Sequence, residues 1–203
     1  MKLSRHLEET LEKNLAALRA HQAELFRLLM RSPLHGCYET VTNGDGQLTL
    51  ARVDAVEELL PVMPGANPIG YARAVVSRMP DLPGPVILAG AGDGMLLAMM
   101  AARRTDSVLV VEPDPELLLR AMQIHDLSGD KGPIRDPRFV WCIGPGWMGR
   151  CRKLLVEQPT LGAPMRAIRG GSARPDIEPS LDRLAAELAR PLAWVQDENP
   201  RVA

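Results

Sequence analysis

The feature that most constrains the fold is a regular alternation, from residue 85 onward, of short apolar runs with amphipathic segments. The apolar runs at 85–89, 107–111 and 139–143 have the length of buried strands. Amphipathic segments at 94–103 and 116–126 follow the first two runs and are long enough to be helices. Because strands that are apolar throughout are typical of a parallel sheet covered on both faces, we expect an α/β fold with a Rossmann-like, doubly wound and mostly parallel sheet.

The N-terminal part of the chain follows a different pattern. Residues 3–31 contain neither proline nor glycine and are predicted to form one long helix that ends before Pro33. Five leucines at helical spacing form one stripe along it: Leu11, Leu15, Leu18, Leu25 and Leu29. Such a stripe packs against its own domain or a neighbouring one, or it forms the seam of a coiled coil in a homodimer. The sequence leaves these alternatives open.

A β-hairpin is predicted at 38–50, because two short β-branched runs flank the turn Asn43–Gly46, whose residues tolerate positive φ. The proline- and glycine-rich segment 61–68 follows it and is predicted to be a linker. We therefore divide the chain into residues 1–64, a long N-terminal helix with a small β-hairpin region, and residues 65–203, the Rossmann-like domain.

Composition and charge exclude several classes of function. Of the 203 residues, 24 are Lys or Arg and 25 are Asp or Glu, so no basic excess supports general nucleic-acid binding. Cys37, Cys142 and Cys151 share no ligand-like spacing with each other or with the four histidines, so no metal site is predicted. The sequence starts without a secretory signal, and no apolar run is long enough for a membrane span. We expect a cytoplasmic protein.

A glycine-rich turn, Gly90-Ala91-Gly92-Asp93-Gly94, joins the first predicted strand to the helix after it. Glycines there let the backbone approach a ligand closely, and the helix N-terminus favours anionic groups. Glu112 ends the second predicted strand, 22 positions (112 minus 90) after Gly90, where an acid can accept hydrogen bonds from ribose hydroxyls. Carboxyl ends of adjacent parallel strands meet at one edge. The predicted nucleotide or cofactor site therefore consists of Gly90, Gly92, Asp93, Gly94 and Glu112.

The same turn also has a purely structural interpretation, since a tight strand-to-helix connection needs glycine in any case. Asp93 in particular is well placed to cap the following helix instead of contacting a ligand. Met95 stands where the dinucleotide fingerprint has Gly or Ala, which disfavours NAD and favours an arrangement like that for S-adenosylmethionine. No residue is identifiable as catalytic.

Two later segments are further candidates. A loop predicted at 143–149 follows the third strand on the same edge, and its glycines either admit a base or simply turn the chain. Arg166, Arg169 and Arg174 flank residues 170–172 in a predicted polar loop that could grip a diphosphate. Solvated arginines are the commoner case in such a loop.

Several stretches together resemble a known family. They are 85–94 (PVILAGAGDG), 110–117 (VVEPDPEL), 126–128 (DLS) and 136–140 (DPRFV). Over about residues 35–145, this series is similar to the N-terminal Rossmann-like module of bacterial motility accessory factor proteins, and similar modules precede other bacterial protein or spore-coat glycosyltransferases. The resemblance implies glycosylation of flagellin with nine-carbon acidic sugars from cytidine-monophosphate donors. It also implies that the transfer chemistry resides in a later domain.

Three functions remain open. The first is an accessory module of a bacterial protein-glycosylation system, which holds a nucleotide or nucleotide-sugar or serves as an interaction platform. Its partner would be a downstream glycosyltransferase domain or another protein, docked through the N-terminal helix. The second is a class I S-adenosylmethionine-dependent methyltransferase, against which the lack of an acid after the third strand counts. The third is a non-catalytic scaffold whose ligand site has decayed.

Overall fold

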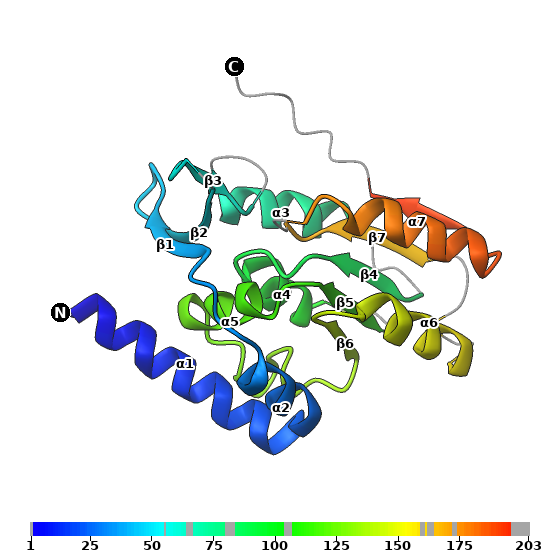
Figure 1. Cartoon of the computed structure of the whole chain (residues 1–203), viewed down its shortest axis with the longest axis horizontal. Coiled ribbons are helices and arrows are strands. Elements are labelled where there is room, and N and C mark those ends of the chain that lie inside the picture. Colours follow the sequence, from blue (N-terminus) through cyan, green and yellow to red (C-terminus); the bar gives the residue numbers. More distant parts are fainter. Residues whose placement is uncertain are drawn as a thin grey trace.

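A computed structural model describes residues 2–54, 56–63, 67–79, 84–103, 107–158, 161, 165–171 and 174–195. The described chain forms a five-stranded sheet with helices on both faces, and a three-stranded sheet beside it (Figure 1). This arrangement confirms the predicted Rossmann-like α/β class, with N-terminal helices and a small antiparallel region before it.

Every neighbouring pair in the five-stranded sheet is parallel. The strands are β4 (Val86–Ala89), β5 (Val108–Glu112), β6 (Phe139–Ile143), β7 (Met165–Arg169) and β8 (Leu192–Trp194). Their spatial order is β6-β5-β4-β7-β8, so chain order reverses between β4 and β7. In an open α/β sheet that reversal opens a crevice at the carboxyl ends of the two strands, where ligands bind.

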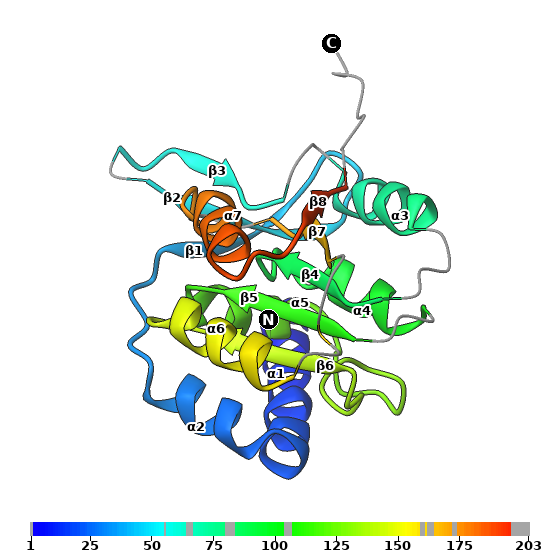
Figure 2. The same cartoon turned by 90° about the vertical axis from the view of Figure 1, so that its right-hand side faces the viewer.

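Alternate strand residues face opposite sides of the sheet, which explains the apolar runs in the sequence. Leu88 and Val110 pack in one core, against α3 (Pro68–Arg78), α4 (Met95–Ala101) and α5 (Pro115–Ile124). Ile87 and Leu109 pack in the other, against α6 (Trp147–Glu157) and α7 (Ile177–Glu187). Figure 2 shows α6 and α7 on one side of the sheet and α3 and α4 on the other.

The N-terminal helix differs from the prediction, because it is interrupted at Gln22, where φ is −135° and ψ is 56°. The two resulting helices are α1 (Lys2–His21) and α2 (Ala23–Arg31). Leucines of the predicted stripe, Leu18 and Leu29 among them, are buried in the same core as α4 and α5. The stripe therefore packs against the chain's own Rossmann-like part.

Asn14 fixes α1 to the end of α5. Its side chain is fully buried, and its Nδ2 donates to the carbonyls of Met122 (2.7 Å) and His125 (2.8 Å). Its Oδ1 accepts from the amide of Leu127 at 2.8 Å. These bonds satisfy backbone groups that the end of a helix leaves without partners. One polar side chain thus sets how α1 lies on the domain.

The predicted hairpin is confirmed as β1 (Tyr38–Thr42) and β2 (Leu48–Val53), which pair antiparallel. Asn43 Oδ1 accepts from two amides of the turn, as expected for an Asn-led turn. A third strand, β3 (Leu59–Pro61), pairs with β2 and was not predicted. Leu50 of β2 packs with Leu117 of α5, so this sheet lies against the Rossmann-like part.

The predicted boundary between residues 64 and 65 lies outside the described residues, and the division into 1–64 and 65–203 stays a prediction. Two sequence interpretations are corrected: residues 147–149 begin helix α6 instead of belonging to a loop, and Arg166 and Arg169 lie in strand β7. Within the described part of the chain, no helix is long and apolar enough to cross a membrane.

Candidate functional site

Residues 90–94, called here the glycine loop, leave the carboxyl end of β4 and enter α4. Gly90, Gly92 and Gly94 have φ of 92°, 58° and 91°, a region that glycine occupies without steric cost. All five residues are buried, and the side chains of Ala91 and Asp93 have no exposed surface. The structure brings Glu112 to this loop, as the spacing predicted, and encloses all of the predicted site residues.

The backbone of the glycine loop interlocks with the turn that follows β7. A Cβ atom on Gly92 would lie 2.0 Å from the carbonyl oxygen of Gly170, and one on Gly170 would lie 1.9 Å from that of Gly90. Real Cβ atoms do not approach so closely, so the glycines here serve backbone-to-backbone packing. Four amides of the loop donate to acceptors of the protein itself, those of Gly90, Ala91, Gly92 and Gly94.

Glu112 closes the other side of the loop. Its Oε2 accepts from the amide of Ala91 at 2.9 Å, and its Oε1 accepts from the amide of Asp114 at 2.8 Å. The side chain has no exposed surface, and burial raises the pKa of its carboxyl to about 8 against the two backbone hydrogen bonds, which lower it. The acid expected to hold a ribose instead joins the loop to the start of α5.

Asp93 performs the capping role that was one of its two sequence interpretations. Its Oδ1 accepts from the amide of Met95 at 3.0 Å, at the start of α4. Its Oδ2 accepts from the hydroxyl of Thr49 in β2 at 3.1 Å, which links the small sheet to the glycine loop. Both carboxylate oxygens of Asp93 are therefore engaged within the protein.

Two more acids hold the preceding segment over this region. The Tyr38 hydroxyl donates to Asp114 Oδ2 at 2.7 Å, and its burial, with that bond, raises the pKa of Tyr38. Glu116, in the first turn of α5, accepts from the amides of His35 (2.7 Å) and Gly36 (3.0 Å). An acid in the first turn also suits the positive end of the helix. The chain between α2 and β1 is thus anchored beside the glycine loop.

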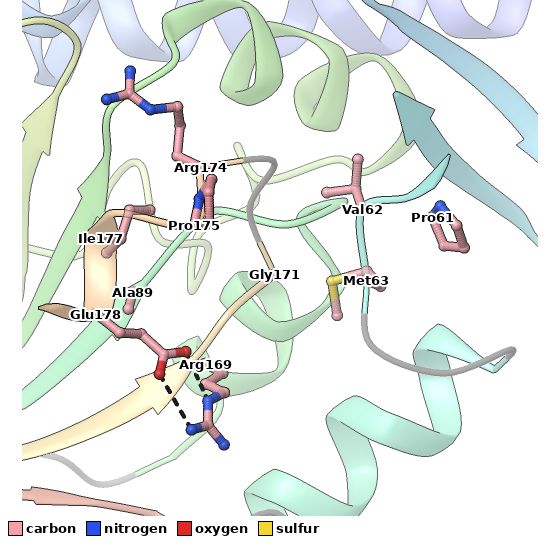
Figure 3. Close-up of a pocket in the computed structure, with 10 residues that line it drawn as sticks. All are labelled: Pro61, Val62, Met63, Ala89, Arg169, Gly171, Arg174, Pro175, Ile177 and Glu178. Atoms are coloured by element: carbon pink, nitrogen blue, oxygen red, sulfur yellow. Dashed lines mark hydrogen bonds and ion pairs between the residues drawn. The ribbon is translucent and has the colours of Figure 1, made fainter. Parts of the chain in front are cut away.

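An open pocket of about 300 Å³ lies next to this closed region, and we call it the arginine pocket (Figure 3). Its lining comes from the ends of β4 and β7, the start of α7 and the segment at β3: Pro61, Val62, Met63, Ala89, Arg169, Gly171, Arg174, Pro175, Ile177 and Glu178. None of the residues of the predicted nucleotide or cofactor site, Gly90, Gly92, Asp93, Gly94 and Glu112, lines it. It occupies the crevice where strand order reverses, where a ligand site is expected.

Charged side chains at the pocket are paired with each other. Arg169 donates through Nε and Nη2 to the two carboxylate oxygens of Glu178, at 2.7 and 3.2 Å, and its guanidinium lies 5.6 Å from the ring centre of Trp194. Arg174 donates to both oxygens of Asp176, at 2.8 and 2.7 Å. That bond holds the pKa of Asp176 below its usual value and raises the pKa of Arg174.

Part of this pocket is predictable from the sequence. Arg169 and Arg174, two of the anion-binding candidates, line it, whereas Arg166 is not among its lining residues. No local motif indicates Glu178 or the apolar wall at Val62 and Met63. Among the described residues, no group of three or more His, Cys, Asp or Glu side chains could hold a metal ion.

The fold is similar to that of the MAf glycosyltransferase from Magnetospirillum magneticum AMB-1, with a TM-score of 0.63 and 16% sequence identity. The match covers 89% of this chain and 35% of that protein, so the chain spans about a third of its length. At this identity the likeness establishes a shared fold. The resemblance found in the sequence agrees with it at that level. The sequence matches no protein-family model and no curated protein.

Proposed function

We propose that this chain is an accessory Rossmann-like module of a bacterial protein-glycosylation system, working beside a glycosyltransferase and not transferring sugar itself. The observation that carries the proposal is the match of nearly the whole chain to one third of a much longer glycosyltransferase. The family resemblance of the sequence supports the same conclusion.

The geometry favours this function over a methyltransferase. A cofactor-binding acid needs oxygens that a ribose can reach, and Glu112 is fully buried with both oxygens bonded to backbone amides. The amides of Gly90, Gly92 and Gly94 donate to backbone carbonyls of the protein. Gly90, Gly92, Asp93, Gly94 and Glu112 stay a prediction as ligand contacts. The contacts that they make support a structural role for them.

The glycosylation role is tested by deleting the coding sequence in the source bacterium and measuring the masses of its glycoproteins. We expect loss or truncation of protein-linked glycans, restored when the wild-type chain is expressed again. Unchanged glycan masses on every glycoprotein would overturn the proposal.

The methyltransferase alternative is tested by thermal unfolding with S-adenosylmethionine and S-adenosylhomocysteine. A ligand at 100 times its Kd adds about 2.7 kcal/mol to stability, which raises the midpoint by several degrees. We expect no shift with either compound. A shift that Glu112→Ala abolishes would establish the methyltransferase instead.

A further inference from the structure

We infer that Cys142 and Cys151 form a redox-active thiol pair, which hydrogen peroxide converts to an intramolecular disulfide between β6 and α6. The inference goes beyond the proposed function and does not depend on it, because it rests on the two cysteines and their surroundings alone. Neither cysteine belongs to the glycine loop or lines the arginine pocket.

The two thiols meet inside the protein. Cys142 lies in β6 and Cys151 in the second turn of α6, and both side chains have no exposed surface. They belong to the same apolar core, in which α6 packs against β6 and β5 (Figure 2). Their side chains are hydrogen-bonded to each other. Because the sulfurs are already in contact, bond formation needs them only to move closer within the core.

The surroundings distinguish the two thiols chemically. The hydrogen bond from Cys151, together with the positive charge of Arg150, lowers the pKa of Cys142 against burial, which raises it. The same hydrogen bond and burial raise the pKa of Cys151. Arg150 is held in place because its guanidinium donates to the carbonyls of residues 143–145. Cys142 is therefore the thiol that attacks the oxidant, and Cys151 is the thiol that completes the disulfide.

The oxidation proceeds in two balanced steps. The Cys142 thiolate attacks one oxygen of hydrogen peroxide, the O–O bond breaks, and the departing hydroxide takes up the proton that Cys142 has released. The Cys151 sulfur then attacks the Cys142 sulfur, the S–O bond of the sulfenic acid breaks, and the departing hydroxide takes the Cys151 proton. Two electrons thus pass from the thiols to the peroxide, which becomes two molecules of water.

Access to the buried pair comes through the start of α6. Gly146 is the N-cap residue and offers no side-chain cap, and the first turn of the helix carries no acid. Gly144 and Gly146 have φ of 82° and 76°, so a glycine turn precedes the helix. A helix start that lacks both a side-chain cap and an acid opens locally more readily than the core around it. Because hydrogen peroxide is close to water in size, it can reach the thiols during such an opening.

The test is oxidation of the folded full chain with hydrogen peroxide, followed by unfolding, alkylation of the remaining thiols and peptide mass mapping. We expect the loss of two of the three thiols of the chain and a pair of peptides joined through Cys142 and Cys151. Dithiothreitol should restore both thiols. Cys37→Ser is the matched control, because Cys37 packs in a different cluster at the small sheet, and it should give the same disulfide in the same yield.

Two further variants test the order of the steps. Cys151→Ser should stop at the sulfenic acid of Cys142, which dimedone traps, whereas Cys142→Ser should leave Cys151 as a thiol. The wild-type result needs no variant, so the test stands even if serine at either buried position prevents folding. The inference is overturned if both thiols of the folded protein survive millimolar peroxide, if the disulfide forms only in the urea-unfolded chain, or if either thiol pairs with Cys37. Dimedone labelling of Cys151 in place of Cys142 would overturn it as well.

Discussion

Two regions share the carboxyl edge of the same parallel sheet, and the protein uses them in opposite ways. At the glycine loop, the backbone packs directly against the backbone of Gly170, and both oxygens of Glu112 accept hydrogen bonds from amides. No side chain of the loop is exposed. At the arginine pocket, the charged groups are paired at the surface of an open cavity. A glycine-rich turn with an acid at the right distance can therefore be structural, while the open cavity lies one strand away.

The largest expected effect comes from Gly92→Ala, which tests the close backbone packing of the glycine loop against the turn after β7. The new Cβ would collide with the Gly170 carbonyl, and φ there is +58°, so both overpacking and backbone strain apply. We expect a loss of about 4 kcal/mol in the free energy of unfolding, measured by urea denaturation. Gly149→Ala is the control, because Gly149 is on the exposed face of α6 and nothing lies within 4 Å of its Cβ position, and it should raise stability by about 0.5 kcal/mol. An unchanged free energy of unfolding in Gly92→Ala would contradict this close packing.

The pH dependence of stability tests the enclosure of Glu112. Its pKa is about 8 in the folded protein and near 4.5 when exposed, so the folded state holds a proton that the unfolded state releases. The contribution of Glu112 is therefore fully present below pH 4.5 and is lost as the pH rises through 8. Glu112→Gln should reduce the fall in stability between pH 5 and 9 by about 4 kcal/mol. Glu12→Gln, on an exposed face of α1, is the control and should keep the wild-type dependence of the free energy of unfolding on pH. The same pH dependence in all three proteins would contradict the burial of Glu112.

A smaller effect compares two tyrosine hydroxyls, one in each region. Tyr38 donates to the carboxylate of Asp114 beside the glycine loop, and Tyr71 donates to the carbonyl of Arg169 beside the arginine pocket, both at 2.7 Å. Bonds to charged groups contribute more, so Tyr38→Phe should cost about 2 kcal/mol and Tyr71→Phe about 1 kcal/mol in chemical denaturation. The reverse order would show that the glycine-loop region is the less tightly held of the two.

The smallest effect is expected in the arginine pocket itself. Arg174→Gln removes an ion pair whose members are 48% and 50% exposed, so stability should change by less than about 1 kcal/mol. Thermal unfolding without ligand measures this. A loss as large as that of Gly92→Ala would mean that Arg174 is a structural residue.

The sequence allowed strands β4, β5 and β6, the turn after β4 and the approach of Glu112 to that turn to be predicted, because each depends on local periodicity or short spacing. It did not allow the closure of the site to be predicted. Gly170 meets Gly90 and Gly92 only after three further strands, β5, β6 and β7, have been added, and no local pattern encodes that contact. The same applies to Thr49, which reaches Asp93 from the small sheet.

Strand β7 shows why the arginines were misplaced. Its sequence, MRAIR, places Arg166 and Arg169 between apolar residues, and polar composition there predicted a loop. In the sheet, Met165, Ala167 and Ile168 are buried, while Arg166 is half-buried and Arg169 is exposed. The break at Gln22 was missed for a related reason, because no proline or glycine marks it.

The most direct test of the account is native-state hydrogen exchange of single amides, followed by NMR. The amides of Ala91, Gly92 and Asp114 donate to Glu112 or to the Gly171 carbonyl inside the closed region. If the glycine loop is structural, these amides exchange only when the whole protein unfolds, with the free energy of global unfolding measured by denaturation. Exchange through a much smaller opening free energy would contradict the account and show a loop that opens to admit a ligand.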